Sequence, residues 1–123
     1  MLETGKSFTQ EVTVTSKDSA AAYGSGHLEV FATPAMVGLM ENTAIRCIDG
    51  LLAPDNDTVG IEINVQHTKA TAVGQKVYCK ATLIEIDGRR LRFDIDAWDD
   101  KGKIGHAIHD RFIIQPEKFM SKL

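Results

Sequence analysis

Hydrophobic and polar residues follow two different periods along this chain. Downstream of Phe31, apolar residues recur close to every 3.6 positions, at Val37, Met40, Ala44, Ile45, Ile48 and Leu52. This spacing predicts one long amphipathic helix. From Asp57 onward apolar and polar residues alternate, which is the pattern of half-buried strands. The chain therefore divides into a helical part and a strand-rich part.

A capping residue, prolines and a glycine set the expected limits of the helix. Thr33 is predicted to be its N-cap, and Pro34 suits the first helical position, where the missing N–H is not needed. Gly50 and Pro54 are expected to close the helix. Before it, residues 17–34 predict a short helical turn, a break at the nearby glycines and an extended piece.

Five segments are predicted to be strands, and short turns join the last four of them. The dipeptide Asp87-Gly88 is a typical hairpin signal. The segments span residues 7–16, 58–72, 76–86, 90–98 and 104–116. A strand, a helix and then a run of strands indicate an α+β fold with the helix on an antiparallel sheet. One helix covers only one sheet face, so the other face or an edge is expected to meet a second subunit.

Composition narrows the class of protein. The 123 residues are 43% hydrophobic and 25% charged, as in a globular protein, and we expect one domain over residues 1–123. A net charge of −3 gives no reason to expect a nucleic-acid partner, and no apolar run is long enough for a membrane span. Cys47 and Cys79 lack metal or disulfide spacing, and with no apolar leader they favour a reducing cytoplasm.

Three residues are candidates for a catalytic role. Glu41 follows Val37 by one turn, so packing should press its carboxylate toward the interior, unless it lies at the edge of the stripe. His67 continues the predicted inward face of Val59, Ile61, Ile63 and Val65, with Gly60 on the opposite face, although a histidine there is often only structural. Thr33 has a sufficient role as a cap, but its hydroxyl also lies beside unpaired N–H groups that suit a developing oxyanion.

Other site types find little support. His106 and His109 are three apart in a predicted strand and should point to opposite faces, which disfavours a metal site. No nucleophile elbow, phosphate loop or dinucleotide motif is present, and we expect neither a metal nor a cofactor.

The chain resembles the hotdog-fold acyl-CoA thioesterases, in particular the fluoroacetyl-CoA thioesterase-like family. The resemblance rests on FATPAMVGLMENTA at residues 31–44, on TVGIEINVQHTKATAVGQKV at 58–77 and on the spacing of the last two strands. It covers residues 7–115 and implies a long helix wrapped by a curved antiparallel sheet of about five strands. It also implies a homodimer, or a dimer of dimers, with acyl-CoA sites at the subunit interface.

The resemblance implies a catalytic group as well. Carried onto this sequence, it comprises Thr33 as nucleophile or water anchor, His67 as general base, and Glu41 to orient or activate. Phe31, Pro34 and Gly60 are implied to contact the substrate, and N–H groups near the helix start or Gly60 to stabilise the oxyanion.

One stretch departs from the pattern of the fluoroacetyl-specific member. Its aromatic gate before the helix corresponds here to AAYGSGHLEVF, which is rich in glycine, with only Tyr23 and Phe31 as aromatic substitutes. This predicts a general short-chain acyl-CoA thioesterase. Two alternatives stay open: a non-catalytic acyl-CoA or small-ligand binding protein, and an enoyl-CoA hydratase, which the lack of Asp or His at the helix start disfavours.

Overall fold

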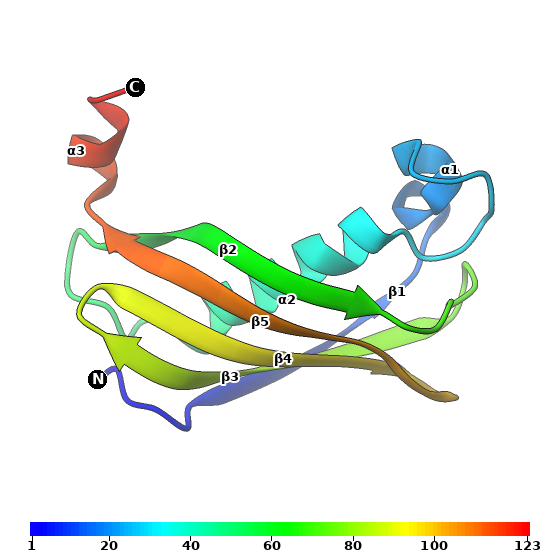
Figure 1. The fold of residues 1–123 in the computed structure, drawn as a ribbon, viewed down its shortest axis with the longest axis horizontal. Coiled ribbons are helices and arrows are strands. Elements are labelled where there is room, and N and C mark those ends of the chain that lie inside the picture. Colours follow the sequence, from blue (N-terminus) through cyan, green and yellow to red (C-terminus); the bar gives the residue numbers. More distant parts are fainter.

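The fold is a curved antiparallel sheet with one long helix on its concave face (Figure 1). A computed structural model describes all 123 residues. Its strands are β1 (Ser7–Thr13), β2 (Asp57–His67), β3 (Lys76–Asp87), β4 (Arg90–Asp99) and β5 (Gly102–Ile114), in the spatial order β1-β3-β4-β5-β2. Helix α2 (Thr33–Cys47) lies against the sheet and contacts β1, β2, β3 and β4. The predicted α+β class with five strands is confirmed.

Short helices flank this framework. The segment before α2 contains a 3-10 turn at Ser16–Asp18 and helix α1 (Ala20–Tyr23), which ends at Gly24 in the left-handed region. The sequence predicted this turn and break. A C-terminal helix, α3 (Pro116–Met120), was not predicted. None of the helices is long and apolar enough to span a bilayer.

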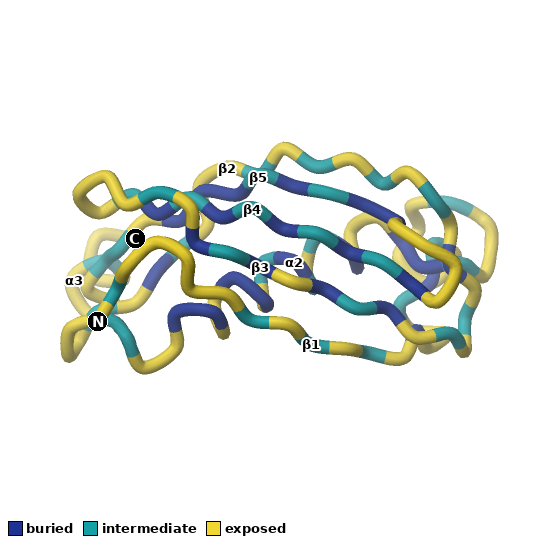
Figure 2. The backbone as a smooth tube through the Cα atoms, turned by 90° about the horizontal axis from the view of Figure 1, so that it is seen from below, coloured by how far each residue is buried: buried dark blue, intermediate teal, exposed yellow.

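The core lies between α2 and the inner face of the sheet. Inward residues of β3 and β4 alternate with partly exposed ones, as the change of colour along these strands shows in Figure 2. Fully buried Phe93, Leu91 and Leu83 pack with Met36 and Met40 of the helix in one hydrophobic cluster. Cys47 and Cys79 are buried and unpaired, as expected, and burial raises the pKa of the Cys79 thiol to about 11.

The buried stripe of α2 is rotated relative to the predicted one. Its buried residues are Ala35, Met36, Met40, Thr43, Ala44 and Cys47. Ile45, predicted inside, is 40% exposed. Glu41 therefore lies at the border of the stripe with 39% of its side chain exposed. The prediction that packing presses it into the interior is wrong; the alternative position at the stripe's edge is correct.

A β-bulge in β2 overturns part of the predicted alternation. The register against β5 shifts between Gly60 and Glu62. An extra residue in one strand reverses which side chains face inward beyond it. Gly60 therefore faces the helix and Ile61 is 53% exposed, the reverse of the prediction. On the C-terminal side of the bulge, His67 keeps the predicted inward face.

Candidate active site

Thr33 and His67 are joined by a hydrogen bond at one end of the molecule. The distance from Thr33 Oγ1 to His67 Nδ1 is 2.8 Å. Thr33 is the first residue of α2, and the N-cap is Ala32, so the predicted capping role of Thr33 is wrong. Pro34 correspondingly occupies the second helical position. The Thr33 hydroxyl, which was expected to cap the helix, is hydrogen-bonded to His67 instead.

Backbone hydrogen bonds hold the two segments that carry this pair. Before the helix, Phe31 N–H donates to the Thr71 carbonyl at 2.8 Å and Ala32 N–H to the Asp18 carbonyl at 2.9 Å. After β2, Thr68 N–H donates to the Ile104 carbonyl at 2.7 Å. The start of the helix and the end of β2 are therefore fixed relative to each other, which positions the hydroxyl on the imidazole.

A buried carboxylate anchors the loop after His67. Asp99, 4% exposed, accepts hydrogen bonds from Lys69 Nζ at 2.6 Å, Thr71 Oγ1 at 2.8 Å and Lys101 N–H at 2.8 Å. Burial alone would raise the pKa of Asp99, but these donors, Lys69 first, hold it below its usual value. The ionised carboxylate thus tethers the chain that follows the histidine.

The surroundings of His67 favour the neutral imidazole. Burial lowers the pKa of His67, and the Lys69 backbone, which favours the charged ring, offsets only part of this effect. Phe31 lies edge-on to the ring, with 6.5 Å between centroids. In the neutral tautomer with its proton on Nε2, Nδ1 accepts the hydrogen bond from the Thr33 hydroxyl. This is the arrangement of a nucleophile beside its general base.

A cavity of about 300 Å³ opens beside the pair. Its lining includes Ala20, Ser25, Phe31, Thr33, His67 and Lys69. Of the predicted substrate-contacting residues, Phe31 is 3% exposed and lines this cavity, whereas Pro34 is exposed and does not. Tyr23 of the preceding segment is 51% exposed and also lies outside the lining.

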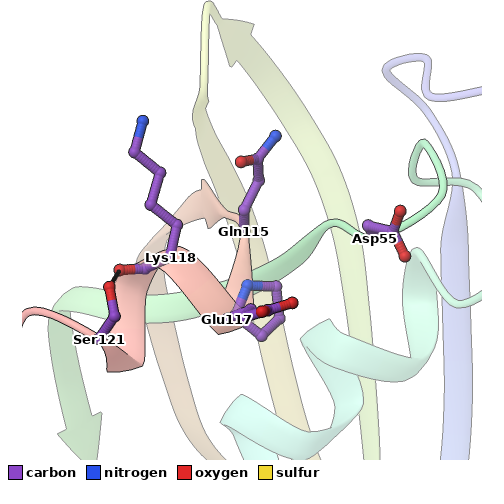
Figure 3. A pocket seen from close by; sticks show the side chains of 6 residues that line it. Asp55, Gln115, Glu117, Lys118 and Ser121 are labelled. Carbon is purple, nitrogen blue, oxygen red and sulfur yellow. Dashed lines mark hydrogen bonds between the residues drawn. The ribbon is translucent and has the colours of Figure 1, made fainter.

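A larger hollow lies elsewhere in the molecule. It measures about 640 Å³ and lies at the α3 end of the sheet, where Figure 3 shows Gln115, Glu117, Lys118 and Ser121 with Asp55 across from them. Ser121 Oγ donates to the Lys118 carbonyl at 2.7 Å. Its lining contains no histidine, and its single hydroxyl, that of Ser121, donates to a backbone carbonyl and not to a side-chain base. The smaller cavity at Thr33 is the candidate site.

Glu41 belongs to a second cluster, farther along α2. A Cβ placed on Gly60 would lie 3.0 Å from Glu41 Oε2, 3.3 Å from Arg111 Nη1 and 3.3 Å from His109 Cε1. Glu41 Oε2 itself is 4.0 Å from Arg111 Nη1. The predicted trio is therefore divided within one chain: Thr33 contacts His67, and Glu41 contacts the group around Gly60.

Sequence reasoning missed the basic members of this second cluster. His109 is 1% and Arg111 5% exposed, and Arg111 donates to Thr58 Oγ1 at 2.9 Å and to the Thr58 carbonyl at 3.1 Å. Burial lowers the pKa of Arg111, and Glu41 acts against that effect. The available signal was a histidine and an arginine two positions apart, on the same face of a predicted strand as Ala107 and Ile113.

His106, by contrast, lies on the outer face of the sheet, opposite His109, as predicted. Its Nε2 is 2.8 Å from Asp94 Oδ1, and Asp96 pairs with Lys103 at 3.3 Å. The donor atoms of Asp94, Asp96 and His106 lie within 4.8 Å of one another. They already bind each other or Lys103, and none belongs to the cavity at Thr33.

Comparisons with known proteins identify relatives of this chain. The family model for fluoroacetyl-CoA-specific thioesterase matches residues 14–117. The fluoroacetyl-CoA thioesterase of Streptantibioticus cattleyicolor is 42% identical over 95 residues, which are 77% of this chain and 68% of that protein.

Solved structures extend the comparison to the fold. The fluoroacetyl-CoA thioesterase FlK superposes with a TM-score of 0.92 at 35% identity, over 99% of this chain and 95% of that one. A FlK variant in complex with fluoroacetate and CoA gives a TM-score of 0.90, over 96% of this chain and 99% of that one. A hot-dog-like protein from Thermanaerovibrio acidaminovorans, 18% identical, gives 0.89 over 97% of this chain and 88% of that one, and so shares the fold. The chain belongs to the fluoroacetyl-CoA-specific thioesterase family of hotdog-fold proteins.

Proposed function

We propose that this protein hydrolyses short-chain acyl-CoA thioesters, with Thr33 and His67 as the reacting pair and a homodimer as the active form. The observation that carries the proposal is the 2.8 Å contact between Thr33 Oγ1 and His67 Nδ1 beside an open cavity, in a chain of this family. The relatives named for fluoroacetyl-CoA support a small acyl group on coenzyme A.

The contact sets the direction of proton transfer. Thr33 Oγ1 attacks the thioester carbonyl carbon while its proton passes to His67 Nδ1, and the C–S bond breaks as the proton moves on to the coenzyme A sulfur. Water then attacks the acyl ester, gives its proton to the same nitrogen, and Thr33 leaves with that proton restored. Both half-reactions need His67 neutral at the start, which agrees with its lowered pKa.

The first turn of α2 supplies the electrostatic counterpart. Thr33 is its first residue, so the attacked carbonyl would lie beside N–H groups that have no partner within the helix. The positive end of the helix dipole also points there. Together these stabilise a developing oxyanion without any metal ion.

Two features support a homodimer that pairs through β2. This strand lies at the edge of the sheet and is bonded only to β5, so its other side has unpaired N–H and C=O groups. A twofold antiparallel pairing of β2 with its copy, centred on Asn64, would keep inward side chains opposite inward ones and, with the extra residue of the bulge, would bring the partner subunit's Gly60 opposite His67. The partner's Glu41, which lies beside that glycine, then approaches the Thr33–His67 pair and activates the attacking water.

Localisation follows from the thiols. Cys47 and Cys79 are both buried and unpaired, a state that a reducing compartment preserves. We therefore propose that the enzyme is cytoplasmic.

Thiol release from a panel of acyl-CoA substrates tests the proposal. We expect turnover of acetyl-CoA or fluoroacetyl-CoA, and losses of at least about a hundredfold in Thr33→Ala and His67→Ala. Thr9→Ala, an exposed threonine on β1, and His106→Ala, on the outer face, are matched controls that should retain activity. Saturable binding without hydrolysis would instead identify a binding protein, and unchanged activity in both site variants would exclude this pair as the reacting groups.

A further inference from the structure

We propose that His109, as a neutral ring, is a positioning residue that fixes the Arg111 guanidinium beside the Glu41 carboxylate. The inference rests on the proposed function, since it concerns the Glu41 side of the hydrolytic site. His109 touches neither Thr33 nor the cavity beside it, and acts through Arg111.

The hydrogen bonds of His109 determine its tautomer. Its Nδ1 is 2.8 Å from the Glu62 carbonyl oxygen, which only accepts, so Nδ1 carries the proton. Its Nε2 is 3.2 Å from Arg111 Nη1, which only donates, so Nε2 must be the acceptor. Both contacts are satisfied by one species, the neutral Nδ1–H imidazole.

This bond completes the orientation of the guanidinium. Arg111 Nε and Nη2 are held by Thr58, and Nη1 is held by His109. Nη1 is also the nitrogen nearest Glu41 Oε2, at 4.0 Å. With three nitrogens engaged, the plane of the guanidinium has no freedom to turn away from the carboxylate.

The charges that act on His109 are those of Arg111 on the same face of its strand, of Glu41 on the helix and of Asp110 on the opposite face of the strand. Burial is the main cause that lowers the pKa of His109, and Arg111 lowers it further, while the Glu62 carbonyl and the two carboxylates act in the opposite direction. Protonation would put a donor on Nε2 against Arg111 Nη1 and break the bond between them. Acid therefore releases the guanidinium from its fixed position.

Two substitutions separate the two hydrogen bonds of the ring. His109→Gln retains an acceptor at the reach of Nε2, whereas His109→Asn retains only a donor to the Glu62 carbonyl. We expect the Gln variant to keep kcat within about threefold of wild type and the Asn variant to lose about tenfold or more in kcat, with KM little changed. Equal activity of the two variants, with both folded by circular dichroism, would overturn the proposal.

The acid side of the pH–rate profile gives a second readout. Wild type should lose activity through protonation of both His67 and His109, so the acid limb of log kcat/KM should be steeper than the slope of one that a single group gives, until the about tenfold contribution of His109 is lost. In His109→Gln only His67 remains, and the slope should fall to about one. An identical acid limb in the two proteins would contradict the inference.

A measurement without substrate keeps this test separate from the proposed function. Long-range ¹H–¹⁵N spectra of the wild-type protein at neutral pH should assign His109 as the neutral Nδ1–H tautomer. An Nε2–H or doubly protonated ring would overturn the positioning role, even in an active enzyme. Failure of wild type to hydrolyse any thioester would overturn the proposed function. The tautomer of His109 would still be decided by the spectrum.

Discussion

If the active site is shared between subunits, two inactive variants should restore activity to each other. On one chain, Glu41 follows Thr33 by eight residues of α2, which is about 12 Å along the helix axis at 1.5 Å per residue. Gly60, beside Glu41, is seven positions from His67 along β2, or roughly 20 Å. Neither separation allows direct contact, so the carboxylate that serves a given Thr33 should come from the partner subunit.

Coexpression of Thr33→Ala and Glu41→Gln chains tests this. In a mixed dimer, one site combines both lesions, and the other combines an intact Thr33 and His67 with the intact Glu41 of the partner subunit. Random pairing makes half of the dimers mixed, so about a quarter of all sites should be intact. Mixed dimers isolated with two affinity tags should therefore recover about half of the wild-type activity per dimer, whereas each parent variant stays inactive.

The matched control combines two substitutions that affect the same reacting pair, Thr33 and His67 of one chain. Thr33→Ala with His67→Ala should give no recovery, because every site of that mixed dimer lacks one member of the reacting pair. Activity regained in the control as well would mean that recovery does not report on Glu41. No recovery with Glu41→Gln, in dimers whose mixed composition mass spectrometry has verified, would place Glu41 outside a shared site and refute the register proposed for β2.

Three further predictions concern single residues. Gly60→Ala should reduce thiol release about tenfold or more, because its Cβ would crowd the Glu41 carboxylate at 3.0 Å, whereas Gly38→Ala, with no atom within 4 Å, should stay active. The lowered pKa of His67 predicts that kcat/KM rises with pH and reaches its plateau already near neutrality. The same shift predicts that the free energy of unfolding, measured by urea titration, decreases as the pH falls below about 6.5, because the unfolded state binds the proton more readily than the folded state. Asp99→Asn should cost about 2–4 kcal/mol in the same titration, since it leaves the Lys69 ammonium without its partner.

How far the sequence predicts this fold depends on how regular each element is. The inward residues of β4 were predicted correctly, because strict alternation of Leu91, Phe93, Ile95 and Ala97 leaves one arrangement that buries all four. Helix α2 was found, but its buried stripe was misplaced. Small residues such as Ala35, Thr43 and Cys47 are buried there, and hydropathy alone did not select them.

The candidate site shows the same limit. Alternation along β2 placed His67 correctly but reversed Gly60 and Ile61, because a bulge is a local irregularity that an alternating pattern does not predict. The capping role expected of Thr33 was wrong, since a capping threonine and one that bonds to a distant histidine look identical in sequence. Contacts across 34 positions depend on tertiary packing, which no local period encodes.

The bulge also explains how the Glu41 carboxylate is accommodated without deep burial. Gly60 turns inward only because the bulge reverses the strand there, and its missing side chain leaves the space into which the Glu41 carboxylate, Arg111 and His109 converge. A regular strand would have presented Ile61 to the helix at this point and filled that space with an apolar side chain. The charge at the edge of the helix stripe is therefore accommodated by one irregularity of the neighbouring strand, and because β2 is the edge strand of the sheet, a partner subunit that paired with it would come close to this carboxylate.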